Sequence, residues 1–426
     1  MPYRKNEIFD AAVIGGGASG LLAAGRLANA GYSTLLLEKM SRLGTKLLIT
    51  GGGRCNLSND APLEEFMEHF FPKRSGLFLR QALDDFSHKE LCNLLYELGV
   101  ETVIERGGRI FPKSQKSSDV LNALRKWTEN TNKFLGASVS NIRKLDDDTF
   151  KIATKSGGLF YSRNVLVATG GASYPQTGTT GDGYEFARKL GHTITPLYPA
   201  LVGLKADRLI TTRIGYLDIK NIEASILVNG KNKKTLFGDM SFMRSGIGGP
   251  VILTLSNIAV EALGADKKVE VSIDLKPALS HEKLDRRLIR EFHNNGTMMI
   301  RNILKNLLPQ KLIQICLEKT MLKSSIRGAE IDSGMRERLR KWLKDFRMDI
   351  SGSKSFSEAI ITGGGISRDE IDPRTMQSRK VDGLYFSGEV IDINADTGGF
   401  NLQAAFSTGW MAAASIMKMI DPDSSI

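Results

Sequence analysis

Positions 15–20 read Gly-Gly-Gly-Ala-Ser-Gly and have the glycine spacing of a dinucleotide-binding turn. In such a turn Gly15 would allow the tight bend, Gly17 would let the backbone approach a pyrophosphate, and Gly20 would let helix and strand pack closely. The first amides of a following helix would offer hydrogen bonds and a partial positive charge to phosphate oxygens. The run therefore predicts a site for the pyrophosphate of NAD or FAD.

The flanking residues supply the strands, helix and acidic side chain that this turn requires. Residues 8–14 predict a buried strand, residues 20–30 an Ala- and Leu-rich helix, and residues 34–37 a second buried strand. Glu38 ends that strand, where its carboxylate would accept hydrogen bonds from a ribose diol and would disfavour a 2′-phosphate. This complete βαβ unit favours a ligand-binding turn over a purely structural one.

Three later segments favour FAD over NAD. Residues 165–171 are an apolar strand that ends in a glycine turn, and residues 383–389 are another that ends in Gly388 and Glu389. The second of these resembles the segment where flavoproteins hold the ribityl chain and pyrophosphate. Residues 397–403 would begin the last helix, whose N-terminal amides could stabilise negative charge at the pyrimidine end of a reduced flavin. An NAD-only dehydrogenase would not need these segments.

The composition is that of a soluble globular protein, with 41% hydrophobic and 25% charged residues among 426. The three cysteines, at positions 55, 92 and 316, have neither metal-ligand nor dithiol spacing, and the five histidines show no metal spacing. These patterns predict no metal site and no disulfide framework. Because neither a secretory signal nor an uncharged apolar run of about 20 residues is visible, we expect a cytoplasmic enzyme.

The formal net charge of +11, with a pI near 9.4, raises the question of a nucleic-acid partner. No basic run is interleaved with aromatic residues, and no nucleic-acid motif is present. We therefore expect a basic surface and a pocket for an anionic cofactor. The expected partner is a small-molecule substrate rather than a nucleic acid or a membrane, and the oligomeric state is left open.

The pattern of predicted elements changes along the chain. Residues 133–167 predict a β-meander, and residues 196–275 alternate apolar and β-branched residues as in an antiparallel sheet or barrel. Residues 281–346 are helical and basic, and the α/β pattern then returns and ends in a long buried helix. The predicted domains are an FAD-binding Rossmann-type domain over residues 1–195 and 356–426, a β-barrel domain over residues 196–278 and 347–355, and a helical domain over residues 279–346.

Five segments together resemble one known family. They are residues 50–59, which contain Gly-Arg-Cys-Asn, and residues 108–112, 178–184, 375–378 and 388–403. By these segments the chain is identified as a member of the HI0933-like flavoproteins, NAD(P)/FAD-dependent oxidoreductases akin to the bile-acid reductase BaiN and to aminoacetone oxidase. The resemblance covers nearly the whole chain. It implies an α/β fold in which a Rossmann-type FAD domain of the two-dinucleotide-binding type carries an inserted β-barrel domain and a small helical domain.

One segment departs from the family pattern. Members commonly carry a Thr-His pair shortly before a Gly-Ile-Ser-Gly-Pro-like run, whereas residues 242–250 of this chain place Met243 and Arg244 at that pair. Chemistry that depends on the histidine therefore does not carry over to this chain. For this reason no catalytic residue is assigned from the sequence.

The predicted FAD contacts lie along the glycine turns, the second strand with its following loop, and the last helix. They are Gly15, Gly17, Ala18, Ser19, Gly20, Glu38, Lys39, Lys46, Gly53, Arg54, Cys55, Asn56, Val139, Ala168, Thr169, Gly170, Gly388, Glu389, Gly399, Asn401 and Leu402. Lys46 and Arg54 would neutralise the pyrophosphate or polarise the flavin, or else form surface salt bridges. Cys55 could be a redox thiol, but packing or backbone positioning is preferred because no partner cysteine is near in sequence.

The leading hypothesis is an FAD-dependent oxidoreductase that transfers hydride between a small organic substrate and the flavin. NAD(P)H could be the electron donor. Residues 363–365 lack the helix-opening glycine of a second nucleotide turn, so a nicotinamide would visit the flavin transiently. The alternatives are a flavin-dependent amine oxidase that uses O₂, a flavin-dependent RNA-modifying or RNA-binding protein, and a non-catalytic redox sensor.

Overall fold

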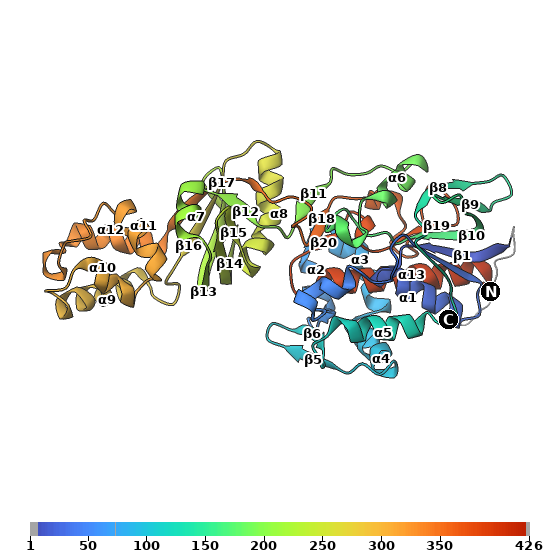
Figure 1. The fold of residues 1–426 in the computed structure, drawn as a ribbon, viewed down its shortest axis with the longest axis horizontal. Helices are drawn as coiled ribbons and strands as arrows, with labels where there is room; N and C mark the ends of the chain where they lie inside the picture. Colours follow the sequence, from blue (N-terminus) through green and yellow to red (C-terminus); the bar gives the residue numbers. More distant parts are fainter. Residues whose placement is uncertain (1–6, 73, 423–426) are drawn as a thin grey trace. The chain divides into compact units, whose positions relative to one another are not determined.

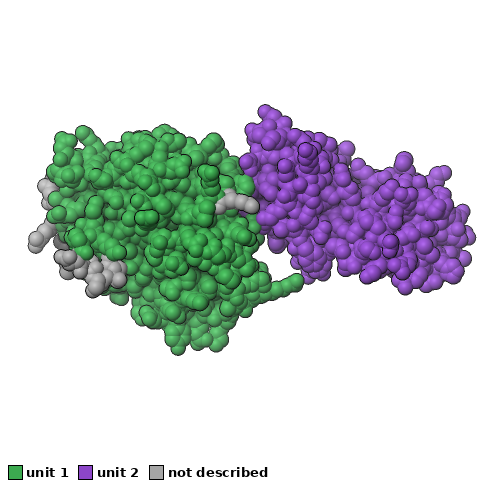
Figure 2. Space-filling view, turned by 180° about the vertical axis from the view of Figure 1, so that it is seen from behind, with its two compact units in different colours: residues 1–199, 356–426 green, residues 200–355 purple. Residues whose placement is uncertain are grey.

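The computed structural model describes residues 7–72 and 74–422, which form two compact units. One unit comprises residues 1–199 and 356–426, and the other comprises residues 200–355 (Figure 2). The chain therefore leaves the first unit once and returns to it. Within the described residues, every helix is too short or too polar to cross a membrane.

The first unit is built on a sheet of seven strands (Figure 1). Five of them run parallel in the order β7 (Asn132–Leu135), β2 (Thr34–Glu38), β1 (Ile8–Ile14), β10 (Leu159–Val167) and β19 (Leu384–Phe386). The last two, β9 (Phe150–Thr154) and β8 (Val139–Lys144), extend the sheet antiparallel from the first half of β10. The inner strands β1 and β2 are buried over most of their length, as expected for parallel strands covered on both faces.

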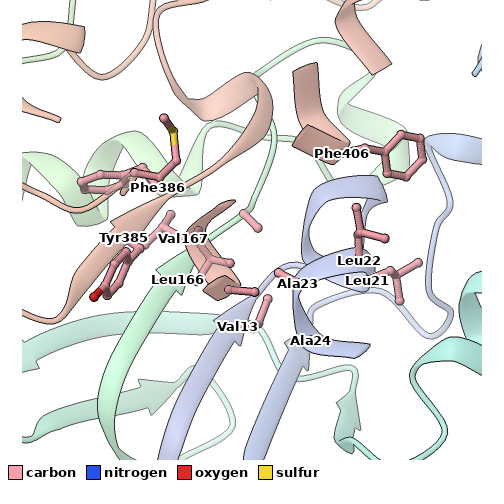
Figure 3. Close-up of a cluster of buried hydrophobic side chains, with 14 of the residues drawn as sticks. Val13, Leu21, Leu22, Ala23, Ala24, Leu166, Val167, Tyr385, Phe386 and Phe406 are labelled. Carbon is pink, nitrogen blue, oxygen red and sulfur yellow. The ribbon is translucent and has the colours of Figure 1, made fainter. Parts of the chain in front are cut away.

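Two helices far apart in sequence pack together on this sheet. They are α1 (Ala18–Asn29) and α13 (Phe400–Ile420), and their closest approach requires a glycine. A Cβ at Gly409 would lie 2.5 Å from Ser19 O. Figure 3 shows the apolar side chains between them and the sheet, with Leu21 and Leu22 on α1 near Val13.

The predicted βαβ unit is confirmed, since β1, α1 and β2 follow one another over the expected residues. The predicted meander is wrong in its first strand. β7 pairs parallel with β2 at the opposite edge of the sheet from β8 and β9. The chain then crosses the end of β2, where the Gly136 N–H donates to Met40 O at 3.0 Å. Residue alternation predicts a strand but does not specify its partner, which explains the error.

Shorter elements surround the main sheet in the first unit. The helices are α2 (Leu63–Glu68), α3 (Arg74–Asp85), α4 (His88–Glu97), α5 (Ser117–Trp127) and α6 (Asp182–Lys189). The small sheets pair β3 (Ser58–Asn59) with β6 (Arg109–Pro112) and β5 (Thr102–Glu105), β4 (Phe70–Phe71) with β20 (Asn394–Ala395), and β11 (Tyr198–Ala200) with β18 (Ile361–Gly363).

The second unit contains a closed barrel of six antiparallel strands. In barrel order they are β12 (Leu204–Ala206), β15 (Gly246–Gly248), β14 (Lys231–Met243), β13 (Leu217–Val228), β16 (Val269–Asp274) and β17 (Phe346–Ser353). Alternate residues of β16 are buried, so one face of the strand lines the barrel interior. The predicted fold class, a Rossmann-type domain with an inserted barrel and a helical region, is confirmed.

Helices complete the second unit. α7 (Arg208–Ile214) and α8 (Pro250–Gly264) pack on the barrel, and α9 (His281–Asn294), α10 (Ile300–Ile303), α11 (Gln310–Lys319) and α12 (Ser333–Lys344) lie between β16 and β17 in sequence. One hydrophobic cluster joins these helices to the barrel. The rings of Trp342 and Phe346 in that cluster have centroids 4.8 Å apart.

Candidate functional site

The turn after β1 accepts only glycine at two of its positions. Gly15 has a φ of +109°, and a Cβ there would lie 2.5 Å from Ala168 O. A Cβ at Gly20 would lie 1.9 Å from Gly15 O, so a side chain at this position cannot be accommodated. These glycines allow β1, β10 and α1 to approach one another closely, as a dinucleotide-binding turn requires.

Gly17 differs from the other two because the space beside it is open. Its backbone angles, φ −83° and ψ −168°, suit any residue, and no atom lies within 4 Å of a Cβ built there. No side chain caps α1, so the first N–H groups of the helix, including those of Ala18 and Ser19, have no intrahelical acceptor. An uncapped helix N-terminus beside open space fits a pyrophosphate group.

Glu38 ends β2 and binds the glycine turn from the other side. Its Oε2 accepts a hydrogen bond from the Gly16 N–H at 2.8 Å, and its Oε1 accepts one from the Met40 N–H at 2.7 Å. Each carboxylate oxygen keeps a second lone pair that could serve a ribose hydroxyl. The Ala137 N–H donates to Glu38 O at 2.9 Å, at the end of β2. Val139, two residues later, therefore also lies near the end of β2.

The end of β10 joins this group. The Ala168 N–H donates to Ile14 O at 2.9 Å, and Gly170, two residues later, has a φ of +71°. Because β1, β2 and β10 run parallel, their carboxyl ends share one edge of the sheet. The fold thus brings Ala168, Thr169 and Gly170 beside the glycine turn.

The segment after β19 is held between α1 and α13. Ser19 Oγ donates to Ser387 Oγ at 2.5 Å, and the Gly388 N–H donates to Thr408 Oγ1 at 2.9 Å. Gly388 has a φ of +73°, and a Cβ there would lie 3.2 Å from Ser19 Cβ. Gly388 therefore lies directly beside the start of α1.

Lys39 and Arg54 each bind a carboxylate of the chain. Lys39 Nζ lies 2.6 Å from Asp182 Oδ2. Arg54 pairs with Glu105, and its guanidinium lies over the Phe111 ring at 4.1 Å from the centroid. For Arg54 these contacts match the salt-bridge alternative of the sequence analysis, whereas Lys39 was predicted only as an FAD contact.

Lys46 and Glu389 form a less exposed ion pair. Lys46 Nζ lies 2.6 Å from Glu389 Oε2 and 2.7 Å from Ser173 Oγ, and the two charged side chains are 20% and 19% exposed. Glu389 Oε1 accepts from the Thr362 N–H at 2.8 Å and from Ser173 Oγ at 2.9 Å. The sequence analysis did not find Ser173, in a loop, or Thr362, in β18, because no recognisable motif marks either residue.

The loop that follows β2 reaches the start of α13. The Asn56 side-chain oxygen accepts from the Gly399 N–H at 3.1 Å, and its nitrogen donates to Ser58 O at 3.2 Å. Gly399 has a φ of +105°, and a Cβ there would lie 2.2 Å from Ser58 O. Glycine at position 399 is therefore required for this close approach.

Cys55 lies in the same loop and is fully buried. Burial raises the pKa of its thiol to about 12, against a smaller opposing effect of a hydrogen bond with Thr50. The thiol is therefore protonated at neutral pH, which fits packing rather than redox chemistry. Cys55 and Gly53 both have positive φ, 61° and 87°, so they shape the loop. Among the described residues, no three His, Cys, Asp or Glu side chains gather as metal ligands do.

The first turn of α13 offers backbone N–H groups rather than the Asn401 side chain. Asn401 Nδ2 donates to Ala395 O at 2.9 Å and to Asp396 O at 3.3 Å, and Oδ1 accepts from the Ala395 N–H at 2.8 Å. No side chain caps the helix at Gly399. The N–H groups of Asn401 and Leu402 lie in the first turn, where they have no intrahelical acceptor.

A histidine to which the sequence analysis gave no role in the site lies beside this turn. His69 stacks on the Phe400 ring with centroids 4.0 Å apart, and its Nδ1 is 3.2 Å from Asp396 Oδ2. No sequence motif marks this pair, because 327 positions separate its members.

Known proteins resemble this chain over nearly its whole length. A family model described as the HI0933-like protein Rossmann domain matches residues 9–415. A 3-dehydro-bile acid delta(4,6)-reductase of Clostridium scindens is 30% identical over 404 residues, which cover 94% of this chain and 97% of that protein. A ribosomal RNA dihydrouridine synthase of Haemophilus influenzae is 27% identical over 414 residues, which cover 95% and 98%. That of Escherichia coli is 25% identical, with 96% and 98% covered.

Solved structures share the fold at low sequence identity. A 3-ketosteroid-delta4-(5alpha)-dehydrogenase from Rhodococcus jostii RHA1 has a TM-score of 0.50 at 13% identity, with 97% of this chain and 98% of that chain covered. A 3-ketosteroid delta1-dehydrogenase from Sterolibacterium denitrificans has a TM-score of 0.50 at 11% identity, with 97% and 100% covered. At these identities the likeness is one of fold.

Proposed function

The chain belongs to the HI0933-like family and is an FAD-dependent oxidoreductase, and from that premise we propose that it reduces a carbon–carbon double bond conjugated to a carbonyl group. The substrate is a small organic molecule, and NAD(P)H is the electron donor. FAD, when bound, supplies the hydride. The side chains and amides of the protein hold the cofactor and the substrate in position.

One observation carries the proposal. Two helices, α1 and α13, begin without a side-chain cap, and the Ser19–Ser387 contact at 2.5 Å ties the start of α1 to the segment before α13. An uncapped N-terminus beside the open space at Gly17 suits the pyrophosphate. A second, at Asn401 and Leu402, suits the negative charge of a reduced flavin. Both ends of one FAD therefore have a suitable electrostatic partner.

The type of reaction comes from the relatives. One is named a delta(4,6)-reductase and two are named dihydrouridine synthases, and each name describes the addition of hydrogen to a carbon–carbon double bond. The relatives differ in substrate but share this step. The shared step, rather than either substrate, supports the assignment to this chain.

The packing of the glycines at 363–365 supports the proposal that NAD(P)H binds without a second nucleotide-binding turn. A Cβ at Gly364 would lie 2.1 Å from Pro196 O, and a Cβ at Gly363 would lie 2.3 Å from the Tyr198 ring. Close chain packing requires these glycines, so their presence does not indicate a nucleotide-binding turn. Without such a turn, NAD(P)H would reach the flavin transiently and leave before the substrate binds.

The test begins with the cofactor of the purified protein, which should be released as FAD and not FMN. Under anaerobic conditions NADH or NADPH should bleach the flavin, and a 3-oxo-4,6-diene bile acid should restore its absorbance in one turnover. Failure of both nicotinamides to bleach the flavin would contradict the proposed donor. Rapid reoxidation by O₂ with an amine substrate, and none by the diene, would favour the amine oxidase instead.

A second candidate is reduction of uridine in RNA, and the distribution of charge favours it. Residues 200–355 hold 28 Lys and Arg against 17 Asp and Glu, whereas the rest of the chain holds 30 of each. The whole formal net charge of +11 therefore belongs to the second unit, and the FAD-binding unit is balanced. Phosphate backbones are recognised mainly by such concentrated positive charge.

A lysine cluster at one end of the barrel gives this candidate a defined surface. The β13–β14 hairpin turns at Asn229, whose N–H donates to Lys268 O at 2.9 Å and whose Oδ1 accepts from the Lys268 N–H at 3.0 Å. This contact joins the hairpin to the turn before β16. The lysines near these two turns are Lys231, Lys233 and Lys234 at the start of β14, and Lys267 and Lys268 before β16.

Salt-dependent RNA binding separates the two candidates. The protein should bind a ribosomal RNA fragment, and its affinity should fall steeply between about 50 and 200 mM salt. The slope of the logarithm of the affinity against the logarithm of the salt concentration measures the number of phosphate contacts. Replacement of Lys231, Lys233 and Lys234 by Glu should lower this slope by about one per lost phosphate contact. Lys113→Glu, at an exposed lysine of the balanced unit, is the matched control. Salt-independent or absent RNA binding would leave the small-molecule substrate as the only candidate.

A further inference from the structure

His69 and Asp396 form a hydrogen-bonded pair at the start of α13. His69 Nδ1 lies 3.2 Å from Asp396 Oδ2, and the Asp396 N–H donates to His69 O at 3.0 Å. The imidazole stacks on the Phe400 ring at 4.0 Å between centroids and 18° between planes. The carboxylate and the aromatic face thus fix the imidazole, and the backbone hydrogen bond holds the two segments together, although the side chain remains 34% exposed.

The loop that carries Asp396 is anchored to the same helical turn. Asn401 Nδ2 donates to Asp396 O at 3.3 Å. β4 (Phe70–Phe71), which follows His69, pairs antiparallel with β20 (Asn394–Ala395), which precedes Asp396. His69 therefore keeps its position relative to the first N–H groups of α13. The proposed function assigns those groups to the pyrimidine end of the flavin.

A carboxylate at Nδ1 decides which ring nitrogen exchanges protons. Asp396 accepts the Nδ1–H, so that Nε2 is the nitrogen that donates or accepts a proton. This arrangement suits a general acid that works once in each turnover. Assigning the tautomer from the carboxylate partner follows from hydrogen-bond geometry.

We propose that His69 is the proton donor of the reduction, an inference that rests on the proposed function. Hydride addition to one carbon of the conjugated double bond leaves the other carbon with an electron pair and in need of a proton. The electron pair on this carbon takes the proton from Nε2 of His69 and forms the new C–H bond. The electrons of the broken Nε2–H bond stay on the nitrogen. His69 then takes a proton from water, so the substrate gains two hydrogens while NAD(P)H loses a hydride.

Other titratable groups of this region are less suited to the step. The Cys55 thiol is fully buried, with its pKa raised by burial to about 12. Tyr184 is 2% exposed, and burial together with the charge of Glu389 raises the pKa of its hydroxyl. Lys46 Nζ already donates to Glu389 and to Ser173. His69 is the most exposed of these groups, at 34% of its side chain, and its carboxylate partner binds only Nδ1 of its two ring nitrogens.

The experiment measures reoxidation of the NAD(P)H-reduced holoenzyme by two acceptors under anaerobic conditions. A 3-oxo-4,6-diene bile acid needs a proton on carbon, whereas ferricyanide takes electrons alone. His69→Gln removes the acid, and His69→Phe removes it while keeping a ring on Phe400. Asp396→Asn tests the partner, and His281→Gln, at an exposed histidine of the second unit, is the control.

We expect His69→Gln and His69→Phe to slow reoxidation by the diene about 100-fold or more, the usual contribution of a general acid. Asp396→Asn should slow it about tenfold, and His281→Gln should leave it unchanged. Flavin content and the ferricyanide rate should match the parent in every variant. Parent-like diene rates in both His69 variants would overturn the assignment of His69 as the proton donor, and would leave the proposed function standing. A parent protein that does not reduce the diene would contradict the proposed function and this inference together.

Discussion

Lys46 Nζ lies 2.6 Å from Glu389 Oε2, although 343 positions separate the two residues in the sequence. Glu389 also accepts from the Thr362 N–H in β18 and from Ser173 Oγ, so three separate segments meet at one carboxylate. The pair connects the loop after β2 to the segment that leads into α13. It therefore joins the two halves of the proposed FAD site, one near the pyrophosphate and one near the flavin.

Breaking this pair should destabilise the protein. Lys46→Met would leave the Glu389 carboxylate, which is only 19% exposed, without its cation. We expect the free energy of unfolding in urea to fall by about 2 kcal/mol, below the cost for a fully buried pair because some water reaches this one. The double variant Lys46→Met/Glu389→Gln should regain part of that loss. A single variant as stable as the parent would show that the pair contributes nothing to the fold.

Two glycines of the turn after β1 should respond in opposite ways to alanine. Gly17→Ala meets open space, so the unfolding free energy of the apoprotein should stay within about 0.5 kcal/mol of the parent. The added methyl group should nevertheless raise the FAD dissociation constant about tenfold, a cost of about 1.4 kcal/mol.

Gly20→Ala serves as the contrast to Gly17→Ala. Its Cβ would lie 1.9 Å from Gly15 O, so the apoprotein itself should lose about 3 kcal/mol through overpacking. Urea unfolding and FAD titration of both variants separate the two effects. A Gly17→Ala protein with parent-like FAD affinity would contradict a pyrophosphate at this turn.

Glu38→Arg should weaken FAD binding. It removes the acceptor for the Gly16 and Met40 N–H groups and places a cation at the expected ribose. The loss should be about 2 kcal/mol, or about thirtyfold in the dissociation constant. Glu38→Gln keeps an acceptor and should lose less. Apoprotein titration with FAD gives both values, and an unchanged affinity for Glu38→Arg would show that Glu38 does not contact the ribose.

Cys55 should resist alkylation in the folded protein. With a pKa of about 12, only about one thiol in ten thousand is ionised near pH 8, and the side chain is fully buried. Iodoacetamide should therefore leave Cys55 unmodified in mass spectra until denaturant is added, whereas half-buried Cys92 should react sooner. Rapid native modification of Cys55 would contradict a packing role.

Local sequence signals predicted the parts of the site that depend on backbone geometry. The turn from Gly15 to Gly20, the helix after it and Glu38 at the end of β2 all lie within one βαβ unit of adjacent residues. Glycine spacing and residue type were sufficient there, because positive φ and close packing are local requirements. The barrel was indicated by alternating residues, although the alternation left an open sheet equally possible.

Contacts between distant residues were not predictable in the same way. Nothing near Lys46 in the sequence indicates Glu389 as its partner, and nothing near His69 indicates Asp396. The same limit explains the error over β7, which lies across β2 from the strands that follow it in sequence. The use of the Asn401 side chain within its own loop became visible only from the fold.

We propose that the first turn of α13 stabilises the reduced flavin, and the midpoint potential of the bound FAD tests this directly. Leu402→Pro removes one backbone N–H yet remains compatible with a first helical turn. The potential, measured by dye-equilibrated reduction, should fall by about 30 mV for a loss of about 1.4 kcal/mol. Leu402→Ala keeps the N–H and should stay close to the parent. Equal potentials in the parent and both variants would contradict a flavin at this helix terminus.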